Sequence, residues 1–586
     1  MEQPQTPGHC GLSGRVWQDP VQQYREPAVL ALCGMLDISV SMARVLAARD
    51  LMDEGNARRF LNPCQEQLHA AELMLGMREA VARLGHAIES HEKILVFGDY
   101  DVDGTASAAI LYSYLKRLGA RVAYHIPHRI TDGYGFTPSS LREIQAWGAE
   151  LVVTTDFGST DLAGPRLLRE IGADLVITDH HQLGPTRPDA VALVNPQQPE
   201  CPYPFKGLSA AGVAFKVVCA LDRHLCDKGF WARQGARRTA PGYYLDLVAL
   251  ATVADMSPLL GENRVLVKLG LAAMNAQPRP GLAGLIKECR IRGAVTAAAI
   301  TFKLAPKINA LGRIGDPRMG VQLLLSHSYS EGRRLARFLV ELNRQRQEIE
   351  RAAYLSARTQ ADAMADRPAL VLVGGDWHPG VVGSIASRLA FETGKPTVAL
   401  TLNRQPDVLG SARGGGGFNI LQALEDCAPL LNRFGGHPGA AGLALSPANL
   451  TAFTERFLHA VERTRATPYP SATRPLAIEA WIDLDTLTHA FVEELQRLSP
   501  FGFCNPEPVL AVRGVLLANP SVFNERHLRF HLNGLDGQQL DAFAWDRSQW
   551  AVSQHVRYDM AFMPQVYEGP GGGRPQVKVL DLKCSD

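Results

Sequence analysis

The sequence lacks the features that mark several classes of protein. None of its ten cysteines forms a Cys-x-x-Cys pair, which argues against a structural zinc site and a disulfide framework and favours a reducing compartment. No uncharged apolar run reaches about 18 residues, and no charged-then-apolar leader opens the chain, so we expect no membrane association and a cytoplasmic location. No GxxxxGK[ST] or GxGxxG motif follows a predicted strand, which argues against a nucleotide-binding module.

Charge is balanced as well. Charged residues make up 20% of the chain, hydrophobic residues make up 46%, and the net charge is +1, as in an ordinary globular protein without an acidic or basic tail. A nucleic-acid role would therefore require local basic patches. At 586 residues the chain is too long for one hydrophobic core, and roughly three to five domains are expected.

The pattern of hydrophobic residues predicts an α/β protein with a change of architecture near its end. Short apolar runs alternate with helical segments between residues 93 and 195, which indicates βαβ units and a parallel sheet. Alternating strands without helices fill residues 508–584, as in a small Greek-key barrel of OB type. The predicted order is a helical arm (1–80), a parallel-sheet core (81–330), a long connecting helix (331–365), a second α/β lobe (366–466) and the OB-type barrel (467–586).

Three of the predicted strands end on acids or histidines. KILVFGDYDVDG ends on Asp99 and Asp101, LVVTTD ends on Asp156, and DLVITDHH ends on Asp179, His180 and His181. The carboxyl ends of parallel strands meet at one edge of the sheet, where ligands bind in α/β proteins. Asp255, after an apolar helix, is expected to fold over the same edge. A cluster of carboxylates repels itself, so we expect divalent metal between them.

This donor set favours phosphoryl hydrolysis. Carboxylates with an imidazole are typical ligands of Mn²⁺, and two divalent ions would balance four aspartates and leave room for a phosphodiester. An aspartate after a strand can also simply cap the next helix. Helix capping can explain one such aspartate, but it is a less expected explanation for acids at the ends of all three strands. Asp103, directly before GTASAAIL, is the residue expected to cap that helix, and it is also counted among the candidate catalytic groups.

In this order the motifs DYDVDG, a strand-ending Asp, DHH and VADMSPL resemble the DHH phosphoesterases, and later segments resemble the bacterial RecJ-type single-strand-specific 5′→3′ exonucleases. The resemblance runs from about Leu36 to the C-terminus. It implies an α/β DHH core, a bridging helix, a DHH-associated domain and an OB-fold. One departure follows Asp156, where Phe157-Gly158-Ser159-Thr160 replaces a more usual Cys-Gly-aliphatic run.

The resemblance also assigns roles to the acidic cluster. It implies that His181 orients the attacking water or stabilises charge on the phosphate, and that Asp179 orients His180. His181, Asp179 and Asp103 are thus the candidate catalytic residues. The implied ligands of two Mn²⁺ or Mg²⁺ ions, with Asp156 bridging them, are Asp99, Asp101, Asp156, His180 and Asp255.

Four further segments combine glycine with arginine or histidine, a pairing expected where backbone N–H groups and a cation share a phosphate: PHRITDGYG, PKINALGRIGDP, GSARGGGG and FGGHPGAAG. Each alone is also typical of a tight turn or a solvated arginine. The resemblance implies a pocket for a terminal 5′ phosphate built from Arg129, Ser411 and Arg413, with Arg313 nearby. It further implies that His437 contacts phosphates nearer the metals.

The predicted function is single-strand-specific 5′→3′ DNA exonuclease activity that releases 5′-mononucleotides in DNA repair and recombination. An alternative is a DHH-family oligoribonuclease or cyclic-dinucleotide phosphodiesterase, but such enzymes typically lack the N-terminal arm and OB-type segment present here. A non-catalytic replication scaffold would have lost metal ligands. The resemblance also implies a bacterial, nucleoid-associated monomer that acts on single-stranded DNA, with a helicase and a single-strand-binding protein as candidate partners.

Overall fold

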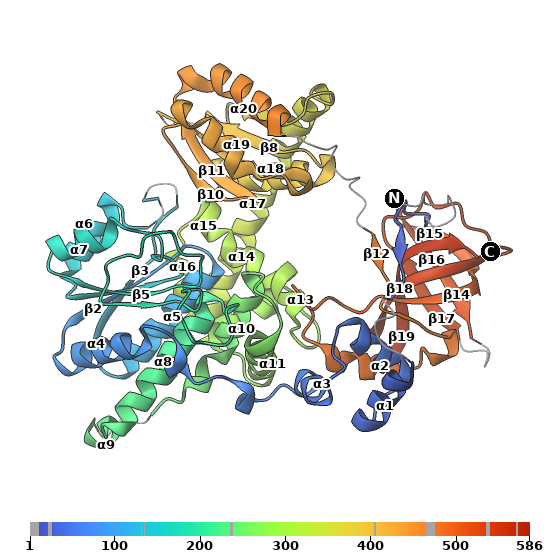
Figure 1. The fold of residues 1–586 in the computed structure, drawn as a ribbon, viewed down its shortest axis with the longest axis horizontal. Helices are drawn as coiled ribbons and strands as arrows, with labels where there is room; N and C mark the ends of the chain where they lie inside the picture. The colour runs from blue at the N-terminus through green and yellow to red at the C-terminus, as the bar shows by residue number, and fades with distance from the viewer. Residues whose placement is uncertain are drawn as a thin grey trace. The chain divides into compact units, whose positions relative to one another are not determined.

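The computed structural model describes residues 11–20, 26–129, 132–133, 135–234, 238–402, 406–464, 475–534, 539–569 and 572–585. These residues form two compact units (Figure 1). The first unit contains residues 65–464 together with 502–504. The second contains residues 11–64, 475–501 and 505–585, so the beginning and the end of the chain fold together.

A five-stranded parallel sheet forms the centre of the first unit. Its order is β3-β2-β4-β5-β6, and its strands are β2 (Lys93–Gly98), β3 (Arg121–His125), β4 (Leu151–Thr155), β5 (Asp174–Thr178) and β6 (Ala192–Val194). The next two strands in the chain, β3 and β4, lie on opposite sides of β2. The crevice between the carboxyl ends of β2 and β4 is therefore the topological switch point, where open α/β sheets bind ligands.

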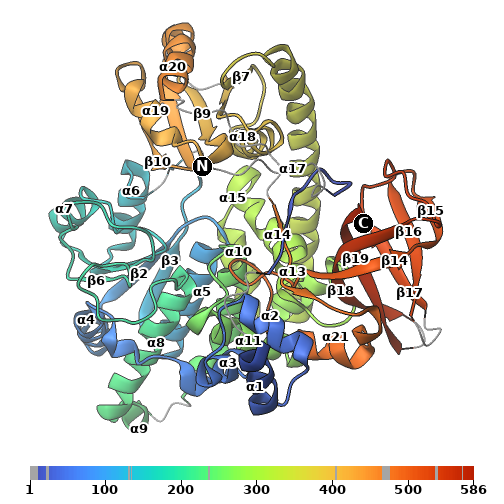
Figure 2. The same ribbon diagram turned by 45° about the vertical axis from the view of Figure 1, so that its right-hand side comes forward.

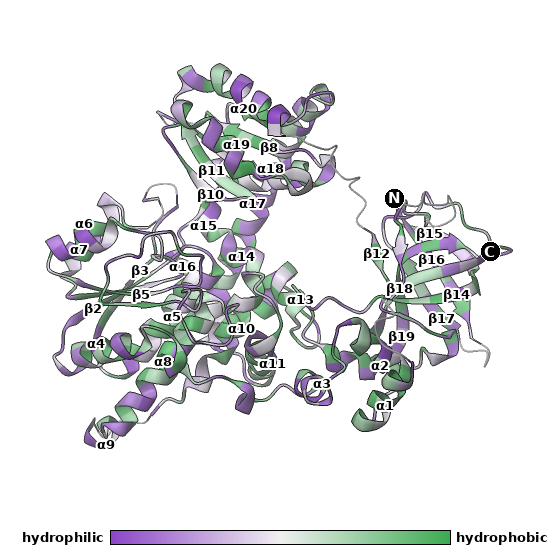
Figure 3. Cartoon of the chain, viewed as in Figure 1, coloured by the Kyte–Doolittle hydropathy of each residue, from purple (hydrophilic) through white to green (hydrophobic). Residues whose placement is uncertain are grey.

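Helices cover both faces of this sheet, because almost every residue of the central strands is apolar and buried. Ile94, Val96 and Val153 pack into the larger core, and Leu95 and Phe97 pack into the core on the opposite face. The helices of the larger core include α4 (Met77–Glu89), α5 (Val102–Arg117), α8 (Ala210–Asp227) and α10 (Leu245–Ala254). The opposite face is covered by α6 (Pro138–Trp147) and α7 (Gly164–Glu170). Figure 3 shows hydrophobic and hydrophilic residues interspersed along most of these helices, whereas nearly every residue of α10 is buried, as expected for a helix inside the core.

A helical region extends this core towards residue 328. It consists of α9 (Phe230–Gln234), α11 (Gly261–Ala276), α12 (Pro280–Glu288), α13 (Ala297–Ala299), the π-helix η4 (Ile300–Leu304), α14 (Ala305–Asn309), α15 (Leu311–Ile314) and α16 (Arg318–Leu324).

The long helix α17 (Tyr329–Ala363) joins the parallel-sheet core to a second lobe, as predicted (Figure 2). Leu335 and Leu339, near its start, are buried in the first core, whereas Ala357 and Ala361 are buried against the second lobe. Phe338, in the first half of the same helix, has 47% of its surface exposed.

The second lobe is also α/β. Its sheet has the order β10-β11-β9-β8-β7, with one parallel pair (β7 and β8) and three antiparallel pairs. The strands are β7 (Leu370–Gly374), β8 (Thr397–Thr401), β9 (Val408–Arg413), β10 (Arg433–His437) and β11 (Ala440–Leu445). The helices are α18 (Pro379–Thr393), α19 (Ile420–Asp426) and α20 (Leu450–Thr464).

The second unit is built on a seven-stranded mixed sheet of order β13-β14-β18-β19-β17-β16-β15. Its strands are β13 (Ala480–Trp481), β14 (Leu510–Leu516), β15 (Ala518–Phe523), β16 (His527–Asn533), β17 (Gln539–Ala544), β18 (Arg557–Gly569) and β19 (Gly572–Cys584). The short strands β1 (Trp17–Gln18) and β12 (Leu476–Ala477) pair beside it. The helices α1 (Glu26–Leu36), α2 (Val40–Ala48), α3 (Glu54–Leu61) and α21 (His489–Leu495) share its core.

Among the described residues, no single helix has the length and hydropathy needed to cross a membrane. Only α1 and α2 taken together, bent by 114° at their junction, meet those limits, and both contribute buried residues to the core of the second unit.

Candidate metal centre and phosphate cavity

The acidic strand ends meet at the switch point of the parallel sheet. Asp99 and Asp101 follow β2, Asp156 follows the neighbouring strand β4, and Asp179 follows β5. Gly104 lets the first turn of α5 approach this edge closely, since a Cβ atom there would lie 2.5 Å from the carbonyl oxygen of Asp99. Asp156 has a left-handed backbone with φ of 70°, a conformation that is costly for a residue with a side chain and that often occurs at functional sites.

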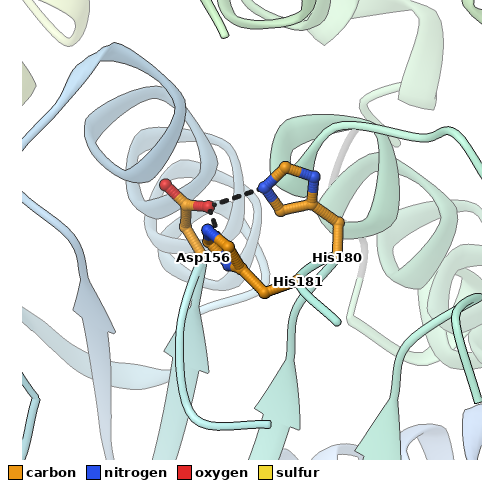
Figure 4. A group of neighbouring side chains, drawn as sticks. All are labelled: Asp156, His180 and His181. Atoms are coloured by element: carbon orange, nitrogen blue, oxygen red, sulfur yellow. Dashed lines mark ion pairs between the residues drawn. The ribbon is translucent and has the colours of Figure 1, made fainter. Parts of the chain in front are cut away.

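Three overlapping groups of side chains at this edge can each hold a metal ion. The ligand atoms within each group lie within 4.8 Å of one another, and the groups are Asp99, Asp101 and Asp156; Asp103, His180 and Asp255; and Asp156, His180 and His181. Figure 4 shows the third group: Nε2 of His180 lies 3.1 Å from Oδ1 of Asp156, and Nδ1 of His181 lies 3.9 Å from the same oxygen. Asp156 and His180 each belong to two groups, so the structure brings together all five predicted ligands.

The electrostatics of this cluster fit divalent cations. Burial, and then the neighbouring Asp101 carboxylate, raise the pKa of Asp99 to about 8. Burial and adjacent carboxylates also hold the pKa values of Asp156 and Asp103 well above the usual range. Oδ1 of Asp99 and Nε2 of His180 are buried without a hydrogen-bond partner, which is costly unless a cation binds them. Carboxylate oxygens with an imidazole nitrogen suit Mn²⁺, and carboxylates also suit Mg²⁺.

The prediction that Asp103 caps α5 is wrong. The N-cap is Asp101, whose side chain accepts a hydrogen bond from the Gly104 backbone N–H at 3.0 Å. Asp103 is the second residue of the helix, and its carboxylate accepts hydrogen bonds from the N–H groups of Ala210 and Ala211 at 2.7 and 2.8 Å. Asp103 therefore anchors the N-terminus of α8 beside the cluster, 3.8 Å from Nε2 of His180.

Asp179 orients a different histidine from the one predicted. Its Oδ1 lies 2.8 Å from Nδ1 of His181 and also accepts the backbone N–H of His180, but it makes no bond to the His180 ring. The two rings lie edge to face with their centroids 4.5 Å apart, but only the His181 ring is bonded to the Asp179 carboxylate. The charge and hydrogen bond of His181 outweigh burial and lower the pKa of Asp179 to about 2. In return, Asp179 outweighs the burial of His181 and raises its pKa to about 9.

Two residues that sequence reasoning missed hold this pair in place. The backbone N–H of Ser159 donates to Oδ2 of Asp179 at 3.0 Å. The amide of Asn195 donates to the Ser159 hydroxyl at 2.8 Å and to the carbonyl of His181 at 2.9 Å. Asn195 directly follows β6, so a fourth strand also ends on a polar residue at this edge. The search for acids and histidines at the ends of predicted strands would have found Asn195 if it had also included amides.

We expect Asp179→Asn to lower kcat by about 10- to 100-fold, the loss typical when a group that orients an active-site residue is removed. The amide can still accept backbone N–H groups, but it cannot match the charge of His181. Steady-state kinetics of phosphodiester hydrolysis, with a Mn²⁺ titration by calorimetry, would check this. An unchanged kcat would show that Asp179 has no part in positioning His181.

A cavity of about 450 Å³ lies beside the metal cluster, between the parallel-sheet core and the second lobe. Arg129 lies over the ring of Tyr100, 5.3 Å from its centroid, and Tyr100 stands between two of the clustered aspartates. The cavity is lined by Arg129, Arg313, Gly380, Gly383, Ser384, Ser387, Arg388, Phe391 and Arg413.

The structure therefore unites most of the predicted phosphate ligands. Arg129, Arg313 and Arg413 line one cavity, and Ser411 joins them because its hydroxyl accepts a hydrogen bond from Nη1 of Arg413 at 2.7 Å. His437 does not line the cavity. It is exposed at the end of β10 and accepts a hydrogen bond from the backbone N–H of Gly439.

The cavity is suited to an anion. Burial, and then the charges of nearby arginines, lower the pKa values of Arg313 and Arg413. Within the described part of the chain, no carboxylate forms an ion pair with Arg129, Arg313 or Arg413. Three guanidinium groups that repel one another in a partly buried space are stabilised by a group with more than one negative charge, such as a terminal phosphate.

Family models match three segments of the chain. They are the DHH family N-terminal domain at residues 93–252, the DHHA1 domain at 366–463 and the RecJ OB domain at 478–581. A relative from Dickeya dadantii, named single-stranded-DNA-specific exonuclease RecJ, is 35% identical over 87% of this chain and 91% of its own length. The chain belongs to the RecJ family.

Other RecJ relatives agree. The Escherichia coli protein of the same name is 33% identical, covering 90% of this chain and 94% of the relative. The crystal structure of RecJ from Thermus thermophilus in complex with Mn²⁺ superposes with a TM-score of 0.80 at 31% identity, over 97% of this chain and 79% of that one. The predicted RecJ resemblance, α/β architecture and OB domain are confirmed. The exact domain boundaries at 80, 330, 365 and 466 stay predictions.

Proposed function

We propose that this protein is a metal-dependent exonuclease that digests single-stranded DNA from its 5′ end and releases 5′-mononucleotides. The observation that carries the proposal is the placement of a carboxylate cluster next to a cavity whose lining includes Arg129, Arg313 and Arg413. The cluster supplies hydrolytic chemistry, and the cavity supplies a grip on a strand end. RecJ relatives bear the name single-stranded-DNA-specific exonuclease, which supports the same substrate.

In this proposal Asp99, Asp101, Asp156, His180 and Asp255 would hold two divalent cations, and Asp156, which belongs to two of the candidate groups, would be a ligand of both. Cations of this kind neutralise charge on the phosphodiester and activate the water that attacks phosphorus. Asp101 has a second task, because the same carboxylate caps α5 and so fixes the loop that carries Asp99.

His181 is the proposed catalytic neighbour of the cluster. Asp179 is ionised and can only accept hydrogen bonds, so Nδ1 of His181 carries the shared proton. Because Asp179 outweighs burial and raises the pKa of His181 to about 9, the imidazole carries a proton on both nitrogens near neutral pH, and Nε2 is available to donate a hydrogen bond to an oxygen of the phosphodiester. Asp103 supports the site indirectly, since it ties α5 to α8 next to His180.

The cavity explains how direction of digestion can arise. If Arg129, Arg313 and Arg413, with Ser411 behind them, bind the terminal 5′ phosphate, the bond that reaches the cluster lies a fixed short distance from that end. A 3′ end carries no terminal phosphate and gains nothing from the arginines. His437, on the edge strand β10, does not line the cavity and is proposed to contact phosphates nearer the metals.

We further propose that the protein acts as a monomer on DNA of the bacterial nucleoid, in repair and recombination, together with a helicase and a single-strand-binding protein. A helicase would supply the single strands that a single-strand-specific enzyme requires.

The test is hydrolysis of three substrates in Mn²⁺: 5′-phosphorylated single-stranded DNA, the same sequence as a blunt duplex, and a cyclic dinucleotide. We expect rapid release of mononucleotides from the single strand only, and none from an Asp101→Ala variant. Preferential hydrolysis of the cyclic dinucleotide would favour the alternative DHH phosphodiesterase, and full activity of the variant would exclude the proposed metal centre.

A further inference from the structure

One face of α18 forms a wall of the arginine cavity. Its residues that line the cavity follow an i, i+3, i+4, i+7, i+8, i+11 pattern, which places them on one side of a helix. The small residues come first, and a phenylalanine ends the series: Gly380, Gly383, Ser384, Ser387, Arg388 and Phe391.

Phe391 is the least buried of the exposed large hydrophobic residues in the described part of the chain, with 86% of its surface accessible. It lies in the last turn of α18 and lines the cavity. A side chain so exposed contributes little to the folded core. The adjacent Arg388 does not cover it, because that guanidinium lies 3.6 Å from the ring centroid of Tyr354 and donates to Glu392 at 2.9 Å. The face of the Phe391 ring is thus free for a planar ligand.

The phosphate end of the cavity and the ring are separated by one helical turn. Ser387 marks the phosphate end, since its hydroxyl accepts a hydrogen bond from Nε of Arg413 at 2.8 Å. Phe391 follows four residues later, about 6 Å further along the helix axis. In a nucleotide the 5′ phosphate and the base are separated by one sugar, so a ligand whose phosphate contacts Arg413 can reach the ring with its own base.

The size of the cavity agrees with a ligand larger than a phosphate group. Its volume of about 450 Å³ falls within the range of roughly 300 to 1,000 Å³ typical of small-molecule sites. Small side chains on α18 leave this space open. Gly380 could not be replaced without displacement, since a Cβ atom there would lie 2.0 Å from the carbonyl oxygen of Arg313.

We propose that Phe391 stacks on the base of the nucleotide that carries the terminal phosphate, so that the cavity is a terminal-nucleotide site. This inference rests on the proposed exonuclease function and adds a positioning contact to it. Stacking accepts any base, because every base presents a π face, which suits an enzyme that must remove each nucleotide in turn. A terminal residue without a base should therefore be held less tightly.

The experiment compares two 5′-phosphorylated oligonucleotides that differ only at the first residue, which carries a base in one and is abasic in the other. For the unmodified protein we expect KM to be about 5- to 150-fold higher for the abasic end, the range of stacking on one aromatic side chain. Phe391→Ala should raise KM for the end with a base by the same factor, leave KM for the abasic end unchanged, and leave kcat unchanged. Phe391→Trp should restore the difference.

Phe338→Ala is the matched control, because Phe338 is also exposed but lies on α17 and does not line the cavity. It should behave as the unmodified protein. If Phe391→Ala still distinguishes the two ends, or weakens both equally, the stacking contact is refuted while the exonuclease function stands. If the unmodified protein fails to digest either oligonucleotide, the proposed function falls and the inference falls with it.

Discussion

Replacing Asp156 with Asn is expected to lower kcat by about 10³-fold or more and, at the same time, to make the metal-free protein more stable. Asp156 lies in two of the three metal-binding groups, so its loss removes several kcal/mol of transition-state stabilisation by the metal centre. Asparagine suits the change, because it tolerates the left-handed backbone at this position and keeps the shape of the side chain.

The gain in stability follows from repulsion within the cluster. Without cations, burial and then the neighbouring carboxylates raise the pKa of Asp156, and a neutral amide relieves both the cost of a buried charge and the repulsion. We expect the Tm of the metal-free protein to rise by about 2–4 °C, the shift that roughly 1 kcal/mol produces in a large domain. We also expect Mn²⁺ to raise the Tm of the unmodified protein but not that of the variant, because ligand binding stabilises only a competent site.

Asp189→Asn provides the control, since Asp189 forms an exposed ion pair with Arg169 and belongs to none of the metal-binding groups. Its activity and its response to Mn²⁺ should match the unmodified protein. Thermal unfolding with and without Mn²⁺ separates the two effects. A lower metal-free Tm for Asp156→Asn, or a retained Mn²⁺ response, would contradict the proposed role of Asp156.

Arg413→Ala is expected to remove most of the preference for a 5′ phosphate. Arg413 lines the cavity and donates hydrogen bonds to both Ser387 and Ser411, so its guanidinium is held in place and can present its remaining donors to a ligand. A hydrogen bond to a charged group contributes about 1.5 to 3 kcal/mol, which corresponds to about 10- to 150-fold in kcat/KM. The loss should occur with 5′-phosphorylated single strands and be small with 5′-hydroxyl strands.

Arg413→Lys tests whether charge alone is enough. Lysine keeps the positive charge but loses the planar fork that binds two phosphate oxygens, so an intermediate preference is expected. The ratio of kcat/KM for phosphorylated and hydroxyl ends is the measurement. An Arg413→Ala variant that keeps the preference of the unmodified protein would show that the terminal phosphate binds elsewhere.

The positions of the metal ligands could be predicted from the sequence because they depend on local rules. Strands end where apolar runs end, parallel strands align their carboxyl ends, and Asp99, Asp156 and His180 therefore had to meet. The choice between Asp101 and Asp103 as helix cap could not be predicted in the same way. It depends on contacts of Asp103 with Ala210 and Ala211, more than a hundred residues away.

The cavity shows a similar limit. Arg129, Arg313 and Arg413 come from three distant segments, and each alone is compatible with a solvated side chain. Only the resemblance to a known family grouped Arg129 and Arg413 with Ser411, and only that resemblance placed Arg313 nearby. Phe391 could not be recognised at all, because a phenylalanine in an amphipathic helix usually faces the core. Its 86% exposure is a property of the folded lobe.

The central claim is that the carboxylate cluster cuts and the arginine cavity sets the direction. It is tested most directly with 5′-phosphorylated single-stranded DNA labelled at either end and digested in Mn²⁺ by the unmodified protein. The proposal predicts that a 5′ label appears at once as mononucleotide, that a 3′-labelled strand shortens progressively, and that a blunt duplex persists. Immediate release of the 3′ label as mononucleotide, or equal digestion of the duplex, would contradict it.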